Sequence, residues 1–319
     1  MDWLGAEVDG PLVAVRAIHF AASATTTGIL VFRAVVAEAS SGSEIPAAIV
    51  VRRQTLLIGW ITLAISALSG LVWLLVGAAS MSGLPFAESM SPDVLWPVVN
   101  ETQFGMVFEI RLVLALMIAG CLVYDRFALA RGLGSVLSLG LSAALAWTGH
   151  AGSTAGATGT LHLASDTLHL VAAAIWTGGL LSLALLLSVS RNHQTHAAVS
   201  FARDATQRFS LMGIAVVVVV LATGIVNSWI LVGSWQALIV TGYGWLLMSK
   251  IALFGVMLLI AVANRFWLTP QLALTSGSEP PFEALRRLAR NSMIEIAMAL
   301  MIFAIVGVLG TWHPAAHLL

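Results

Sequence analysis

Long apolar runs separated by short polar segments are the dominant pattern of this chain. Windows of about twenty apolar residues are long enough to cross the hydrocarbon core of a bilayer as helices. The pattern therefore predicts an all-α fold: a polytopic membrane protein in which residues 1–319 form a single transmembrane domain, a bundle of eight helices. The predicted spans are residues 11–36, 54–79, 103–124, 133–149, 160–189, 208–232, 244–264 and 290–312.

The basic residues between these spans alternate, and this alternation predicts an orientation. The segments at 80–102, 150–159 and 233–243 contain no Lys or Arg. Cytoplasmic loops carry the excess of Lys and Arg, so both termini and these three segments are expected on the periplasmic side. The chain begins Met1-Asp2-Trp3, without the basic start of a signal peptide, and we expect no cleavable targeting segment. The arginines of the remaining loops are Arg52, Arg53, Arg126, Arg131, Arg191, Arg203, Arg208, Arg265, Arg286, Arg287 and Arg290.

Composition agrees with a membrane protein and excludes several other classes. Hydrophobic residues make up 59% of the chain and charged residues only 9%, with a mean hydropathy of +0.95. The net charge is zero, so there is no basic surface for a nucleic acid, and membrane lipid is the expected surrounding. Cys121 is the single cysteine, which excludes an intramolecular disulfide and a cysteine-based metal cluster.

Polar residues that could bind a metal gather toward the predicted periplasmic side. An ionisable side chain inside a membrane span is a candidate functional residue by default, because it must find a partner or a ligand there. His162, Asp166 and His169 are spaced i, i+4 and i+7, which places them on one helix face. Asp166 is roughly 6 Å and His169 roughly 10 Å deeper than His162. Six of the eight histidines fall on this side: His19, His150, His162, His169, His313 and His317.

Histidine combined with methionine is a ligand set for copper, and zinc would also accept His and Asp. His19 lies about 12 Å into the first span from the same side. The candidate metal residues are His19, His150, His162, Asp166 and His169, and the additional candidates are Met106, Glu109 and His313.

Each histidine also has a structural interpretation. A lone intramembrane histidine is more often a hydrogen-bonded packing residue than a ligand. The pairing of His162 and His169 with Asp166 favours the ligand interpretation, whereas for His19 the two interpretations are balanced. His193 and His196 fall in a basic cytoplasmic loop and are expected to be solvated.

Further charges inside the spans need partners, and we expect Arg111, Lys250 and Glu295 to have structural or coupling roles. Lys250 lies about 9 Å from the periplasmic side and Glu295 about 8 Å from the cytoplasmic side, so these two are not expected to pair. Lys250 could instead pair with Glu109 or Asp166. Arg16 and Arg111 are expected to snorkel outward or to pair with carboxylates.

Several motifs together resemble the copper resistance protein D family. The motifs are Arg208-Phe209-Ser210, Thr223-Gly224, Gly242-Tyr243-Gly244-Trp245-Leu246-Leu247-Met248-Ser249-Lys250, Asn264-Arg265, His162-x3-Asp166-x2-His169 and Ala173-Ala174-Ile175-Trp176-Thr177-Gly178-Gly179-Leu180, with Glu295 in the last span. The resemblance covers nearly the whole chain. It implies eight spans with both ends periplasmic, a bacterial inner-membrane location, and copper as the ion handled, usually by import. By position, the resemblance implies that the copper-related residues are His19, His150, His162, Asp166 and His169.

The resemblance also implies a partner, a small periplasmic copper-binding protein. Some members of the family carry it fused to the membrane part, and this chain, which contains no such domain, is expected to need a separate one.

Three functions remain open from the sequence. The first is a copper permease, although the cytoplasmic half shows no second tier of His, Met or Cys. The second is a membrane oxidoreductase with haem b, ligated by His19 with His169 or by His150 with His162. The third is a copper sensor or assembly factor that binds metal without moving it. Hydrolase motifs are absent, and an enzyme is not expected unless the metal or haem is redox-active.

Overall fold

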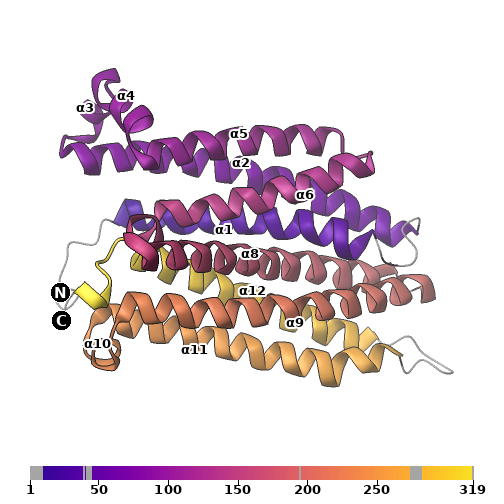
Figure 1. Ribbon diagram of the computed structural model, residues 1–319. Coiled ribbons are helices and arrows are strands. Elements are labelled where there is room, and N and C mark those ends of the chain that lie inside the picture. Colours follow the sequence, from indigo (N-terminus) through magenta and orange to yellow (C-terminus); the bar gives the residue numbers. More distant parts are fainter. Residues whose placement is uncertain (1–9, 39, 41–44, 194, 274–281, 318–319) are drawn as a thin grey trace.

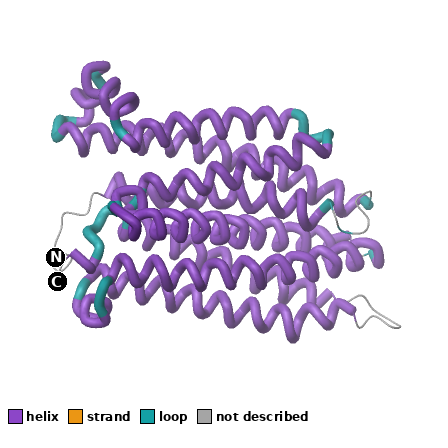
Figure 2. Tube along the Cα trace, in the orientation of Figure 1, coloured by secondary structure: helices purple, strands orange, loops and turns teal. Residues whose placement is uncertain are grey.

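The computed structural model describes residues 10–38, 40, 45–193, 195–273 and 282–317, and nearly all of them are helical (Figures 1 and 2). Eight helices are long and apolar enough to cross a membrane, which confirms the predicted number of spans. Three of them continue at their ends as π-helix or 3-10 helix. The eight are α1 (Gly10–Phe32, continued by η1, Arg33–Ala37), α2 (Pro46–Ser82), α5 (Gln103–Val123), α6 (Ala128–Ala143, continued by η2, Ala144–Thr148), α8 (Gly156–His193), α9 (His196–Val232), α11 (Gly242–Ala263, continued by η3, Asn264–Leu268, and η4, Thr269–Ala273) and α12 (Phe282–Leu309).

Arginines separate the two ends of this bundle. We call the end where α1 begins and α12 ends the terminal end, and the opposite end the arginine-rich end. The arginine-rich end carries the loop arginines of the sequence together with Arg33 at the end of α1. There Asp125 accepts from Arg33 at 2.7 Å and from Arg52 at 3.3 Å, and Arg131 pairs with Glu38.

Four helices extend well beyond the predicted spans at the arginine-rich end. α2 begins eight residues, α9 twelve residues and α12 eight residues before the predicted start, and α8 ends four residues after the predicted end. These extensions pack against one another, because Phe201, Leu285 and Leu288 belong to one buried cluster with the span residues. Hydropathy marks the part of a helix that lipid covers, and the helix itself continues where its neighbours cover it.

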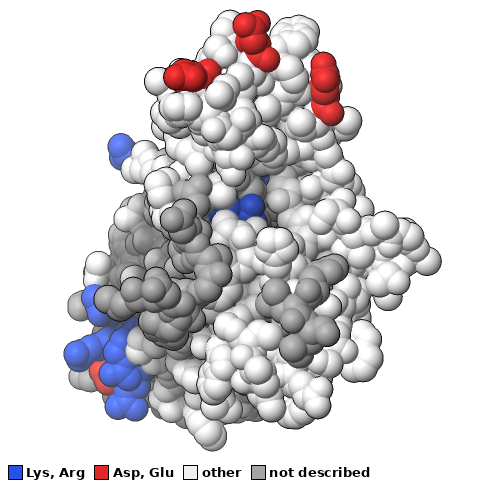
Figure 3. Space-filling view, turned by 90° about the vertical axis from the view of Figure 1, so that its left-hand side faces the viewer, with Lys and Arg blue, Asp and Glu red and all other residues white. Residues whose placement is uncertain are grey.

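Short helices lie at the terminal end, between the spans or after the last of them. They are α3 (Phe86–Ser89), α4 (Pro92–Glu101), α7 (His150–Ser153), α10 (Trp235–Val240) and η5 (Ala315–His317). The side chains of Thr102 and Thr241 accept hydrogen bonds from the backbone N–H of Gly105 and Gly244 and so cap the starts of α5 and α11. In the view onto this end, acidic side chains gather over α3 and α4 (Figure 3). The exposed carboxylates of these helices and their junction are Glu88, Asp93 and Glu101.

α1 and α8 form the centre of the bundle. In their most apolar stretches 72% and 61% of residues are buried, against 11% in α11. α1 packs against α2, α6, α8 and α12, and α8 packs against α1, α9 and α12. Gly28 and Gly178 allow the closest approach, since a Cβ on Gly28 would lie 2.5 Å from the Cα of Gly178. The bundle thus consists of an N-terminal half (α1, α2, α5 and α6) and a C-terminal half (α8, α9, α11 and α12), joined mainly through α1 and α8.

Candidate functional site

The polar face of α8 is directed at α9, in the terminal-end half of the bundle. His169 Nδ1 lies 3.0 Å from Thr223 Oγ1, and Asn227 Nδ2 donates to Asp166 Oδ1 at 3.1 Å. Thr223 and Asn227 are four residues apart on α9, so they share a face and lie opposite the corresponding pair on α8. His162 is on the same face of α8, nearer the terminal end, and is only 1% exposed.

The hydrogen bonds of Thr223 determine the tautomer of His169. The Thr223 hydroxyl has one proton, and it donates this proton to the carbonyl oxygen of Val219 at 2.5 Å. Its contact with His169 must therefore be one in which the Nδ1–H donates to Thr223 Oγ1. In a neutral imidazole this leaves the lone pair on Nε2, the atom that a metal ion would bind.

His162 is held in the same way. Its Nδ1 lies 2.9 Å from Thr154 Oγ1, and Thr154 donates its own proton to the carbonyl oxygen of His150 at 2.8 Å. The lone pair of His162 is therefore also on Nε2. His150 differs, because its Nε2 donates to the carbonyl oxygen of Leu309 at 3.1 Å and that atom is not available to a ligand.

His19 has an identical hydrogen-bonding arrangement in a different place. Its Nδ1 lies 3.0 Å from Ser69 Oγ on α2, and Ser69 donates to the carbonyl oxygen of Ile65 at 2.6 Å. The ring packs edge-on against Trp73, with centroids 5.3 Å apart, and close to Gly70, where a Cβ would lie 3.0 Å from the ring. The structure therefore places His19 against α2 and His169 against α9, and it does not direct the two rings at one cavity.

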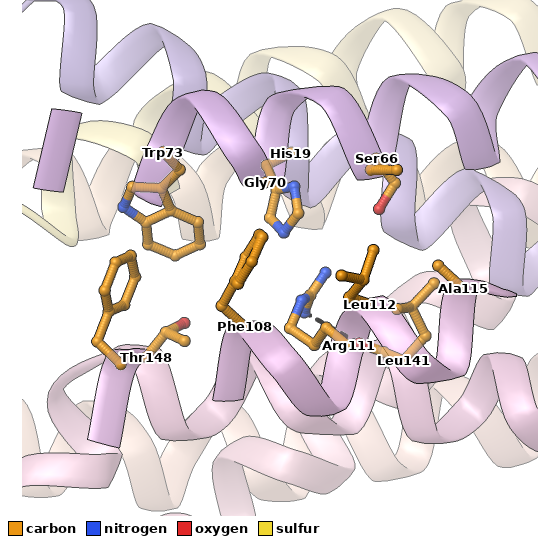
Figure 4. Close-up of a pocket in the computed structure, with 12 residues that line it drawn as sticks. His19, Ser66, Gly70, Trp73, Phe108, Arg111, Leu112, Ala115, Leu141 and Thr148 are labelled. Carbon is orange, nitrogen blue, oxygen red and sulfur yellow. Dashed lines mark hydrogen bonds between the residues drawn. The ribbon is translucent and has the colours of Figure 1, made fainter. Parts of the chain in front are cut away.

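A small cavity lies beside His19, between α2 and α5 (Figure 4). Its volume is about 30 Å³, and Phe108, Arg111 and Thr148 also line it. Figure 4 shows the imidazole of His19 and the guanidinium of Arg111 directed toward each other across this space. The cavity therefore combines a ring nitrogen with a buried positive charge.

The expectation that Arg111 snorkels outward or pairs with a carboxylate is wrong, and for Arg16 the structure contradicts outward snorkelling. Both are buried, Arg16 at 8% and Arg111 at 6% exposed. Arg111 donates to the carbonyl oxygen of Leu141 and to Ser23 Oγ, each at 3.0 Å, and so links α5 to α6 and α1. The guanidinium of Arg16 lies 4.8 Å from the centre of the Trp73 ring. Among the described residues no carboxylate pairs with either arginine.

Lys250 of α11 provides the charge nearest to the polar face of α8. It is close enough to Asp166 and His169 to interact with both electrostatically. Of the two partners considered for Lys250, the structure favours Asp166, because Glu109 is exposed on α5 in the other half of the bundle.

The additional candidates lie away from these clusters. Met106 is 58% exposed on α5, on an outward face that also carries Glu109, and His313 is exposed beyond the end of α12. Thr154, Thr223 and Asn227, which position the α8 side chains, were not among the predicted site residues. For Thr223 and Asn227 a signal was present in the sequence: two polar residues four apart in the otherwise apolar span α9.

Across the described parts of the chain, no three His, Cys, Asp or Glu side chains converge on one point. The candidate residues instead form a line along α8, with a carboxylate between two imidazoles whose Nε2 atoms are available.

These features define a class: a polytopic helical membrane protein with buried imidazole and carboxylate side chains inside its bundle. The chain belongs to the copper resistance protein D family. The model of the copper resistance protein D-like N-terminal domain matches residues 7–160, and the model of copper resistance protein D matches residues 203–309. The first match covers the N-terminal half of the bundle, the second covers most of α9 and all of α11 and α12, and most of α8 lies between the two.

Relatives agree with this assignment. The chain is 30% identical to copper resistance protein D of Pseudomonas syringae pv. tomato over 79% of its own length and 82% of the relative. It is 29% identical to the inner membrane protein YebZ of Escherichia coli, covering 76% of the chain and 82% of the relative. It is also 29% identical to the copper transport protein CutJ of Bacillus subtilis over 69% of the chain but only 40% of that longer protein. No solved structure matches. The chain is thus a multi-pass inner-membrane protein with a role in copper handling.

Proposed function

We propose that this protein imports copper from the periplasm across the inner membrane, and that the ion binds along α8 at His162, Asp166 and His169. The observation that carries this proposal is the hydrogen-bonded state of the two histidines. The hydroxyls of Thr154 and Thr223 each accept a hydrogen bond from a histidine Nδ1–H and donate their own proton to a main-chain carbonyl. The imidazoles of His162 and His169 therefore each carry a lone pair on Nε2. Outer partners of this kind orient metal-binding histidines and fix their tautomer.

Charge favours this location over the cavity beside His19. Asp166 supplies a negative charge between the two imidazoles, whereas His19 has Arg111 beside it and no carboxylate among the described residues that line its cavity. A cation that displaces Lys250 finds a counter-charge at the first site, whereas the second site offers it the positive charge of Arg111. We therefore leave His19 and His150 out of the proposed copper site.

Lys250 has a natural role in the copper-free protein. A carboxylate inside the membrane is costly unless a cation lies nearby, and the ammonium group of Lys250 interacts with Asp166. Copper binding would replace this ammonium as the cation that compensates Asp166. Binding and release of the ion are then accompanied by a movement of the Lys250 side chain.

The ligand atoms favour Cu(II). Imidazole serves both oxidation states, a carboxylate suits the harder ion, and the thioether candidate Met106 faces away from the bundle. The arginine distribution supports an orientation with the terminal end in the periplasm. We expect a separate small periplasmic copper-binding protein to deliver the ion at that end, where α3 and α4 carry their carboxylates.

Copper analysis of the purified protein tests the site. We expect about one copper per chain, with the electron paramagnetic resonance spectrum of Cu(II) bound to nitrogen. His169→Ala should lose most of this copper, because it removes one of two imidazole ligands. His193→Ala is the matched control, since His193 is exposed at the arginine-rich end. Full copper occupancy in His169→Ala would show that the site assignment is wrong.

Uptake into proteoliposomes tests the transport. Vesicles that contain a copper-sensitive dye should accumulate copper with the wild type and with His193→Ala, but at a rate at least tenfold lower with His169→Ala. Binding without any uptake would refute transport and favour a sensor or assembly factor. Haem absorbance in the purified protein would favour the oxidoreductase instead.

A further inference from the structure

Glu295 is the most deeply buried carboxylate of the membrane spans. It is 1% exposed and lies on α12, five residues and so about 8 Å along the helix from Arg290. One oxygen, Oε1, accepts a hydrogen bond from Asn264 Nδ2 at 3.0 Å. The other, Oε2, is buried and has no hydrogen-bond partner among the described residues.

No described positive charge compensates this carboxylate. α12 packs against α1, α8, α11 and the π-helical segment η3. On these elements Arg33 is paired with Asp125, Arg265 donates to Ser210 Oγ, and Lys250 interacts with Asp166 in the other half of the membrane. The remaining ionisable side chains with a basic group or a carboxylate on these elements are Arg191 and His193 at the end of α8, His162 and His169 in its terminal-end half, Arg286, Arg287, Arg290 and Glu283 at the start of α12, and Arg16 and His19 in the terminal-end half of α1. None of them forms an ion pair with Glu295.

Asn264 connects Glu295 to the surface at the arginine-rich end. Its side chain donates to Glu295 and accepts from Asn291 Nδ2 at 2.7 Å. The main-chain carbonyl oxygen of Asn264 accepts a hydrogen bond from Thr269 Oγ1 at 2.8 Å. Thr269 in turn lines a groove of about 480 Å³ between α9 and η3–η4, together with Gln207, Ser210, Leu211, Arg265, Phe266 and Pro270. Asn264 begins η3, and π-helical turns of this kind frequently occur at functional sites.

We propose that Glu295 is a proton-binding site in the arginine-rich half of the bundle, and that it exchanges its proton with that side through the groove beside Thr269. A proton on Oε2 neutralises the carboxylate without any further ligand, which suits an oxygen that has no partner. A metal cation would need several additional ligands, whereas the described hydrogen bonds connect Glu295 only to the amide of Asn264 and, through it, to the amide of Asn291. When the proton leaves, it passes to water in the groove, and the carboxylate keeps the electron pair of the O–H bond.

The inference rests on the proposed function in one respect, namely that proton exchange accompanies copper passage. The copper ion would bring positive charge through the bundle from the terminal end, and a proton released from Glu295 would offset part of it at the arginine-rich end. The proton site itself does not depend on copper, so it can be tested separately.

Infrared difference spectroscopy tests the proton directly. The wild type minus Glu295→Gln spectrum should contain the C=O band of a protonated carboxyl group, and this band should shift in D₂O. Glu109→Gln is the matched control because Glu109 is exposed on a span, and this substitution should leave the Glu295 band in place. Asn264→Ala removes the donor to Oε1 and should shift the frequency of the band while keeping it. A difference spectrum that shows an ionised carboxylate, or no exchange in D₂O, would overturn the proposal.

Transport distinguishes this proposal from the copper proposal. In proteoliposomes with a transmembrane pH difference, wild-type copper uptake should change at least threefold when the gradient is reversed, and Glu295→Gln should lose this dependence. Copper uptake that ignores the gradient, with no protonated carboxyl band, refutes the proton site and leaves copper transport intact. A protonated band in a protein that moves no copper refutes the transport and supports the proton site.

Discussion

Two histidine sites in the terminal-end half of the bundle have the same hydrogen bonds and different electrostatic surroundings. His19 on α1 and His169 on α8 each donate from Nδ1 to a hydroxyl whose own proton goes to a carbonyl. Beside His19 lies the guanidinium of Arg111, and beside His169 lie Asp166 and Lys250. The two halves of the protein thus hold equivalent imidazoles in unlike charge environments.

The difference shows that an available ring nitrogen is not enough to make a copper site. An Nε2 lone pair binds a metal ion only if the surrounding charges tolerate the ion. In the proposed function, Asp166 supplies this tolerance at His169, and copper displaces the lysine next to it. Arg111 is fixed in place, because its guanidinium donates hydrogen bonds to the carbonyl oxygen of Leu141 and to Ser23 Oγ and so joins three helices. We therefore interpret the His19 site as a structural junction and propose the His169 site as the one that accepts a cation.

The largest expected effect comes from Asp166→Asn. This change keeps the shape of the side chain and removes the charge that distinguishes the two sites. We expect copper affinity to fall by about 100-fold, which corresponds to about 2.8 kcal/mol. Equilibrium titration of the purified protein with buffered copper measures it. His19→Ala is the comparison, and it should leave copper affinity within about twofold of the wild type. A larger loss in His19→Ala than in Asp166→Asn would reverse the roles of the two sites.

A smaller effect is expected from the hydroxyls that orient the rings. In Thr223→Val the new side chain has nearly the same shape as threonine, but it cannot accept the hydrogen bond from His169 Nδ1. Loss of such an outer partner typically costs 10- to 100-fold in metal affinity, and we expect about tenfold here. The equivalent change at the other site, Ser69→Ala, should leave copper affinity unchanged. The same titration provides the measurement. Equal losses in the two variants would mean that His19 is also a ligand.

The sequence predicted the number of spans and the candidate side chains, but not which way they face. The rise per residue of a helix gives the depth of each residue in the membrane. The six histidines could therefore be assigned to one layer on the terminal-end side. Direction around the helix axis depends on neighbouring helices. α5 is apolar all round, so nothing in its pattern showed that Met106 and Glu109 face outward and Arg111 inward.

Hydrogen bonds between distant segments were also beyond the sequence. Arg111 was expected near a carboxylate, and it instead reaches the carbonyl of Leu141, at the point where α6 tightens into the 3-10 turns of η2. Thr154 lies in a short connection and gave no sign that it would orient His162. The ligand assignment, the orientation of the termini and the extent of the domain stay predictions.

The smallest expected effect concerns Lys250, the charge that the His19 site does not have. Lys250→Met removes an ammonium group that competes with copper for Asp166 and retains a long flexible side chain. We expect copper to bind about fivefold more tightly, a gain of about 1 kcal/mol, because the ion no longer displaces a cation. Copper release should slow by a similar factor, which stopped-flow transfer to a chelator measures. Ser249→Ala, one residue away on the exposed face of α11, is the control and should change neither quantity. Weaker binding in Lys250→Met would show that Lys250 stabilises the occupied site, and that copper does not replace it.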